Sequence, residues 1–110
     1  VFAIAFSPDS QQLASASHDK TFKLWDVNQG NSLLTLTGYN YAMFAVAFTP
    51  SGQWLAVGSD DNTITLWEMT SHRLLHTLTG HQAAVYSLVF SPDGQLLASG
   101  SADKTIKIWR

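Results

Sequence analysis

Residues 85–109 read VYSLVFSPDGQLLASGSADKTIKIW, and the chain contains two earlier versions of this stretch. A shift of 42 residues, from 85 to 43, places it on residues 43–67 without an insertion. A second equal shift places it on residues 1–25. A fixed period of this length indicates a repeat architecture. We therefore expect nearly three copies of one unit, at residues 1–42, 43–84 and 85–110.

Each unit carries signals for short strands. Residues 85–90 are rich in β-branched and aromatic side chains and end at the turn sequence Ser91-Pro92-Asp93-Gly94. Glycine at the last position can take the positive φ that closes a tight hairpin. The first unit has Ser10 at this place, so a looser turn is expected there. Further strands are expected at residues 96–100, 105–109 and, in the middle unit, 74–78.

Four strands in each 42-residue unit predict an all-β fold built from antiparallel propeller blades. Residues 1–42 and 43–84 would each form a blade, and residues 85–110 would supply three strands of another. Because propellers close with about four to eight blades, about two and two-thirds blades would be part of a larger ring. The ring would be completed by further blades of the same chain or by copies of it.

Composition narrows the function. The chain is 45% hydrophobic and 13% charged, so it has enough apolar residues for a packed core. Its net charge of −2 argues against nucleic acid or an anionic membrane as partner. With no cysteine, it has no disulfide framework, thiolate metal site or cysteine nucleophile. The sequence shows neither an apolar run long enough to span a membrane nor a signal peptide, so we expect a cytoplasmic location.

The motifs resemble the WD-repeat family of β-propellers over the whole chain. The Gly80-His81 dipeptide, the Ser-Pro-Asp-Gly turn, Asp103 and Trp109 stand where that family has them. The dipeptide becomes Gly38-Tyr39 one repeat earlier, and the name-giving Trp-Asp pair is Trp25-Asp26, Trp67-Glu68 and Trp109-Arg110. The resemblance implies a structural hydrogen-bond network in each blade. By motif position its members would be His81, Ser99, Asp103 and Trp109, then Ser15, Asp19 and Trp25, and in the middle unit Asp61 and Trp67.

A serine, a histidine and an aspartate also make up a hydrolytic triad, but a nucleophile must be exposed in a cleft. Ser99 lies within a predicted strand and lacks a glycine-rich elbow. We therefore expect no catalytic residues. His72 and His76 are only two potential ligands, so neither a metal site nor a cofactor is expected.

Trp54 departs from the repeat, because the other units have Gln12 and Leu96 at this position. Large apolar side chains are mostly buried, so we expect Trp54 to pack in the core and not to serve as a contact residue. The repeated Trp25, Trp67 and Trp109 are also expected to lie in the core.

The resemblance further implies a partner-binding rim, formed where the inner strands begin and just before each turn aspartate. The corresponding residues are Phe2, Phe44, Tyr86, Ala42, Ala84, His18, Asp60 and Ala102. Aromatic side chains among polar ones are typical of protein-contact surfaces. The alternative is that these aromatics pack around the mouth of the channel.

The resulting prediction is a non-catalytic scaffold that binds one or more protein partners. One alternative is an architectural segment that only completes a ring. The other is an enzyme with its catalytic groups at the channel, but the inner strands carry no acidic residue or histidine (residues 3–5, 45–47 and 87–89).

Overall fold

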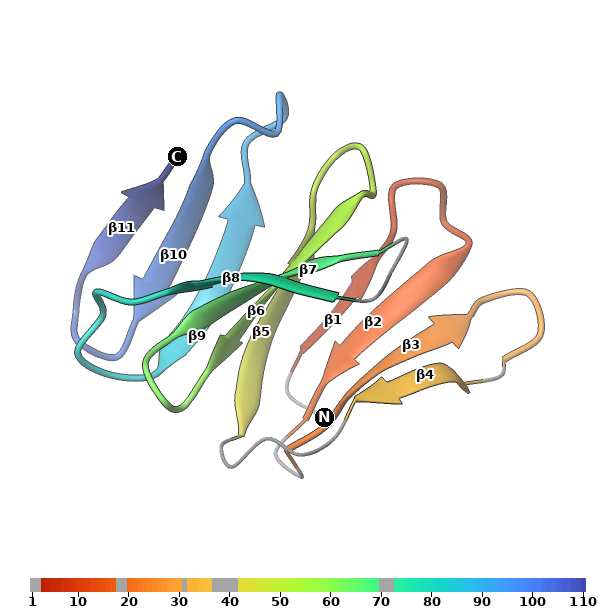
Figure 1. Ribbon diagram of the computed structural model, residues 1–110, viewed down its shortest axis with the longest axis horizontal. Coiled ribbons are helices and arrows are strands. Elements are labelled where there is room, and N and C mark those ends of the chain that lie inside the picture. The colour runs from red at the N-terminus through yellow and green to blue at the C-terminus, as the bar shows by residue number, and fades with distance from the viewer. Residues whose placement is uncertain (1–2, 18–19, 31, 37–41, 70–72) are drawn as a thin grey trace.

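The computed structural model describes residues 3–17, 20–30, 32–36, 42–69 and 73–110. Within these ranges the regular structure consists of strands, arranged in three antiparallel sheets (Figure 1). The first sheet contains β1 (Ala3–Phe6), β2 (Gln12–Ala16), β3 (Phe22–Asp26) and β4 (Ser32–Leu36). The second contains β5 (Met43–Phe48), β6 (Trp54–Ser59), β7 (Ile64–Glu68) and β8 (Arg73–Leu78). The third contains β9 (Val85–Phe90), β10 (Leu97–Ser101) and β11 (Ile106–Trp109).

The sheets stand side by side in chain order, with the second between the other two (Figure 1). In each sheet, strands that follow one another in sequence are hydrogen-bonded neighbours. The first strands of the sheets are adjacent, β1 beside β5 and β5 beside β9. This arrangement confirms the predicted all-β class of four-stranded antiparallel units.

The hairpin turn after each first strand has the same geometry in all three units. The expectation of a looser turn at Ser10 is wrong. Ser10 takes a φ of 61°, and its N–H donates to the carbonyl of Ser7 at 2.9 Å, as Gly94 does to Ser91. The carboxylate of Asp9 accepts hydrogen bonds from the Ser7 hydroxyl at 2.6 Å and from the N–H of Gln11 at 2.9 Å, as Asp93 does in the third unit.

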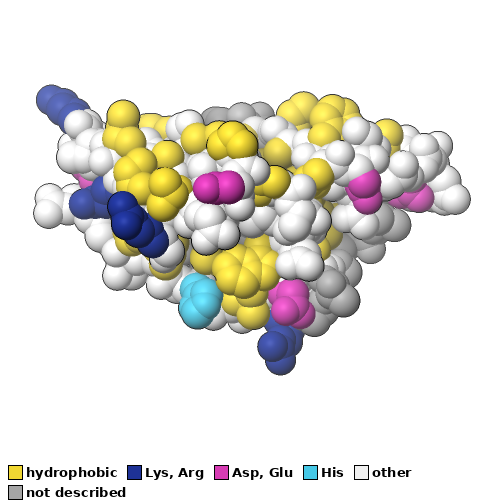
Figure 2. Space-filling model, turned by 90° about the horizontal axis from the view of Figure 1, so that it is seen from above, with side chains coloured by type: hydrophobic (Ala, Val, Ile, Leu, Met, Phe, Trp, Pro, Cys, Tyr) yellow, Lys and Arg dark blue, Asp and Glu magenta, His cyan; other side chains and the backbone are white. Residues whose placement is uncertain are grey.

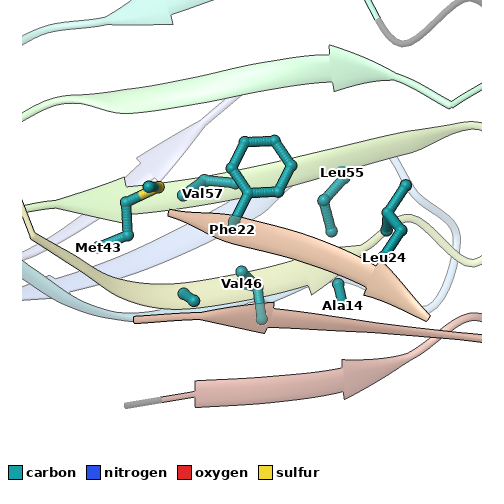
Figure 3. Close-up of a cluster of buried hydrophobic side chains, with 8 residues drawn as sticks. Ala14, Phe22, Leu24, Met43, Val46, Leu55 and Val57 are labelled. Atoms are coloured by element: carbon teal, nitrogen blue, oxygen red, sulfur yellow. The ribbon is translucent and has the colours of Figure 1, made fainter. Parts of the chain in front are cut away.

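A hydrophobic cluster joins the first sheet to the second. Side chains of β2 and β3 meet those of β5 and β6, and Figure 3 shows them pointing toward one another. The buried members are Ala14, Ala16, Phe22, Leu24, Met43, Val46, Leu55 and Val57. Because successive side chains of a strand point to opposite faces, β6 sends Leu55 and Val57 into this cluster and Ala56 to the other face.

A second cluster joins the second sheet to the third. Its buried members are Ala56, Ile64, Leu66, Val85 and Leu97. Phe90 and Trp109 pack against it from the third sheet. The middle sheet is thus apolar on both faces, which explains why β6 lacks a polar alternation.

The outer faces of the first and third sheets are apolar and exposed. Ile106 on β11 is 77% exposed, whereas Ile64, its equivalent one repeat earlier, is fully buried. Likewise Ile4 on β1 is 61% exposed, whereas its equivalent Val46 is 8% exposed. On the side shown in Figure 2, apolar side chains reach the surface in several separate groups.

No helix long and apolar enough to cross a membrane occurs in the part of the chain that the structure describes.

Candidate functional site

Four side chains of the third unit form a continuous hydrogen-bonded chain. His81 lies before β9, Ser99 on β10, Asp103 in the turn after β10, and Trp109 on β11. His81 Nδ1 is 3.0 Å from Asp103 Oδ2, and His81 Nε2 is 2.6 Å from Ser99 Oγ. The Trp109 indole N–H donates to Ser99 Oγ at 2.8 Å. These hydrogen bonds therefore connect the segment before β9 and the turn after β10 to strands β10 and β11.

The direction of each hydrogen bond follows from its partners. A carboxylate only accepts, so in a neutral imidazole Nδ1 of His81 carries the proton that is donated to Asp103. An indole only donates, so Ser99 Oγ accepts from Trp109 and donates its own proton to Nε2 of His81. Each polar side-chain atom in this four-residue network is thereby paired, as buried polar groups generally are.

Asp103 has further donors around it. Its Oδ2 accepts from the backbone N–H of Gln82 at 3.0 Å, and its Oδ1 accepts from the backbone N–H of Thr105 at 2.9 Å. The Thr105 hydroxyl also donates to Oδ1. These hydrogen bonds, the Thr105 hydroxyl first and then the N–H of Gln82, hold the pKa of Asp103 well below its usual range.

The first unit shows part of the same arrangement. The Trp25 indole N–H donates to Ser15 Oγ at 3.1 Å, across the β2–β3 pair. Asp19, the predicted acidic member, lies outside the described residues.

In the middle unit, the carboxylate of the turn aspartate, Asp61, has different hydrogen-bond partners. Asp61 accepts hydrogen bonds within its own turn from the hydroxyl of Ser59 and from both the N–H and the hydroxyl of Thr63, at 3.1 and 2.6 Å. Burial alone would raise the pKa of Asp61, but these hydrogen bonds outweigh it and lower the pKa below its ordinary value. Tyr39, which stands at the histidine position, lies outside the described residues.

The Trp67 indole finds a partner that sequence reasoning missed. Its N–H donates to Thr65 Oγ1 at 3.0 Å, because Val57 at the serine position offers no acceptor. The sequence does contain a signal for this change: Thr65 replaces the lysine that the other two units have at this position, Lys23 and Lys107.

The geometry of Ser99, His81 and Asp103 resembles a hydrolytic triad, but Ser99 is only 1% exposed. Its Oγ also holds the indole N–H of Trp109, so the hydroxyl is enclosed by the network. A nucleophile must reach its substrate. Within the described residues, moreover, no group of three or more histidine, aspartate or glutamate side chains could hold a metal ion. His72 lies outside those residues.

The predicted rim residues that the structure describes lie at one end of the sheets. The N–H of Asp60 donates to the carbonyl of Ala42 at 2.9 Å, and the N–H of Ala102 donates to that of Ala84 at 3.0 Å. The side chains of Ala42 and Ala84 are buried at the base of the rim. Their backbone carbonyls accept the hydrogen bonds that hold the two turns.

Two aromatic rim residues touch. The rings of Phe44 on β5 and Tyr86 on β9 have centroids 5.0 Å apart, and Tyr86 is 55% exposed. Asp60 and Ala102 are exposed beside them. Phe2 and His18 lie outside the described residues.

Trp54 is 38% exposed, so the expectation that it packs in the core is wrong. It begins β6 at the end of the sheets opposite the rim, and its ring centroid is 6.5 Å from that of His76 on β8. The first unit has Gln12 at the equivalent position, so the repeat does not require a large apolar side chain there.

We next compared the chain with known proteins, and the matches agree with the three repeated sheets. Residues 1–26, 30–68 and 72–110 match the family described as WD domain, G-beta repeat. The chain belongs to the WD-repeat family. Members of this WD-repeat family are generally non-catalytic interaction scaffolds.

Part of this WD-repeat chain matches two curated relatives. WD repeat-containing protein 1 of Bos taurus is 54% identical over 37 residues, and that of Gallus gallus is 54% identical over 35 residues. These segments cover 34% and 32% of this chain and 6% of each relative. The WD-repeat chain therefore spans a small fraction of their length.

Solved structures match the fold over nearly the whole WD-repeat chain. A structure of U3-55K and a crystal structure of RRP9 WD40 repeats each give a TM-score of 0.94 at 30% identity. Each match covers 98% of this chain, and 35% and 34% of the respective solved chain. The chain thus corresponds to about a third of each of those structures.

Proposed function

We propose that the chain is a non-catalytic protein-interaction scaffold, a segment of a larger WD-repeat propeller that offers its rim to a protein partner. The observation that carries this proposal is the ring pair of Phe44 and Tyr86, 5.0 Å apart on adjacent first strands. More than half of the Tyr86 surface is open. Tyrosine on a polar rim is typical of residues that contribute most to protein binding.

The base of the rim is held firmly. The Ser101 hydroxyl contacts the carbonyls of Ala83 and Ala84 at 3.0 and 2.9 Å, and the N–H of Ala102 also binds the Ala84 carbonyl. These contacts join the segment before β9 to the turn after β10. A surface fixed in this way loses little conformational entropy when a partner binds.

The apolar outer faces support the second half of the proposal. Ile106 and Ile108 on β11 are exposed, yet their equivalents in the first and second sheets are covered by the next sheet. Ile4 and Phe6 on β1 are the counterparts of residues that do the covering. Further repeats, of the same chain or of a copy, would bury both faces. An architectural role in completing a ring is compatible with the same packing.

Site-specific photo-crosslinking tests the rim. Benzoylphenylalanine at position 86, in place of Tyr86, should crosslink to a partner protein in the native extract. The matched control carries it in place of Thr77, an exposed residue of the edge strand β8. Discrete adducts at position 86 alone are expected. Adducts of equal yield at both positions, or none at position 86, would overturn the rim assignment.

A further inference from the structure

A groove of about 340 Å³ runs between the second and third sheets, at the end of the molecule opposite the rim. Its floor is apolar and comes from both sheets, with Leu78 on one side and Phe90, Leu97 and Trp109 on the other. Its volume lies within the range of ligand-binding pockets, which are mostly apolar with a few placed polar groups. This groove is separate from the rim and goes beyond the function proposed above.

The wall of the groove is formed by Trp54. The indole lies beside the His76 ring, with centroids 6.5 Å apart, and more than a third of its surface is open. The repeat does not require a tryptophan at this place, because Gln12 begins β2 in the first sheet. An exposed tryptophan that the fold does not need is available to a ligand.

The register positions of the groove residues provide an internal comparison. Gln12 stands at the Trp54 position in the first unit. Glu68 occupies the register position that Arg110 has in the third unit. Trp54 and Arg110, the two residues on which the proposed site depends, therefore both depart from the repeat.

The charge at the groove indicates what it binds. Arg110 lines it, and no carboxylate is among the described residues that do so. A guanidinium forms strong, often bidentate hydrogen bonds with a carboxylate. The geometry points to a peptide segment of a partner protein, whose large apolar side chain enters beside Trp54 while a neighbouring aspartate or glutamate pairs with Arg110.

Selection from a displayed library of random dodecapeptides tests this site, with the assembled protein as bait, at a concentration where light scattering gives one defined mass. Sequences that bind the empty support are removed first. The survivors should combine an aromatic or large aliphatic residue with an adjacent acidic one. Trp54→Gln should weaken their binding about tenfold or more, the loss expected for an aromatic anchor. The Arg110→Glu variant should also lose about tenfold, and a selection against it should enrich basic residues instead.

Both variants are compatible with the fold, because glutamine and glutamate occupy these register positions in other units. Tyr86→Lys serves as the matched control: it should weaken binding of the partner captured by rim crosslinking and leave peptide binding unchanged, so the two sites fail or succeed separately. The assignment is overturned if no sequence is enriched, or if enriched sequences lack acidic residues. It is also overturned if 4-phenylbutyrate binds as tightly as the selected peptides, because the groove would then be a small-molecule site.

Discussion

The Nδ1 atom of His81 lies 3.0 Å from Oδ2 of Asp103, and this contact joins the segment before β9 to the turn after β10. Among the described residues, the side chain of Asp61 accepts hydrogen bonds from its own turn. The two aspartates share a register position but differ in what they connect. One holds two segments together, whereas the other stabilises a single turn.

Asp103→Ala should therefore destabilise the protein more than Asp61→Ala. Loss of Asp103 leaves Nδ1 of the buried His81 imidazole with only the long contact to the Thr105 hydroxyl, 3.4 Å away, and a poorly paired buried group carries a desolvation cost. Loss of Asp61 removes only bonds within a turn. Chemical-denaturant midpoints of both variants measure the ranking. A lower midpoint for Asp61→Ala would show that the middle unit has a network of its own.

Ser99→Val should lower the free energy of unfolding by about 1–3 kcal/mol, because it leaves the Trp109 N–H and His81 Nε2 unpaired. The middle unit suggests a rescue. Adding Lys107→Thr copies Thr65, which serves the indole of Trp67 where Val57 replaces the serine. The double variant should regain about 0.5–1.5 kcal/mol. If Lys107→Thr alone stabilises the wild-type chain equally, the indole is not its target.

Trp67→Ala should cost about 3 kcal/mol or more, as expected when a large packed aromatic is truncated. Its ring lies edge-on to Phe22 with centroids 5.3 Å apart, across the seam between the first and second sheets. Thr77→Ala, on the exposed edge strand, should change stability by less than about 0.5 kcal/mol. Urea unfolding of the two variants compares them directly. Similar losses would mean that the seam contributes little.

Stability should fall in acid. The pKa values of Asp61 and Asp103 are lowered from their ordinary value of 3.8, so the unfolded chain binds protons before the folded chain does. The stabilisation is complete above about pH 5 and is lost as the pH falls below about 4 toward the folded-state pKa values. Denaturant midpoints at pH 7, 5 and 3 should therefore decline mainly in the last step. In the double variant Asp61→Asn, Asp103→Asn this decline should be shallower.

The exposed outer faces should make the isolated chain associate. Repeat units bury their apolar faces only against neighbours, so light scattering should give a mass above 12.0 kDa that rises with concentration. Ile106→Lys places a charge on one outer face and should lower that mass, whereas Thr77→Lys should not. A monomeric mass together with a sharp cooperative melt would contradict the proposed packing.

The repeat, the class of fold and the places of most strands and turns could be predicted from the amino-acid sequence. These features depend on local patterns that recur at a fixed spacing, so three copies reinforce one another. The resemblance to the WD-repeat family implied the network of His81, Ser99, Asp103 and Trp109, and their side chains lie within hydrogen-bonding distance.

Features that depend on contacts between sheets could be seen only in the folded molecule. The Thr65 hydroxyl serves the Trp67 indole, Ala42 and Ala84 turn inward, and Trp54 stays at the surface beside a groove. A strand pattern tells which side chains share a face, but not which neighbour covers that face or leaves it open. Burial at such positions is settled by the packing of units that lie tens of residues apart in sequence.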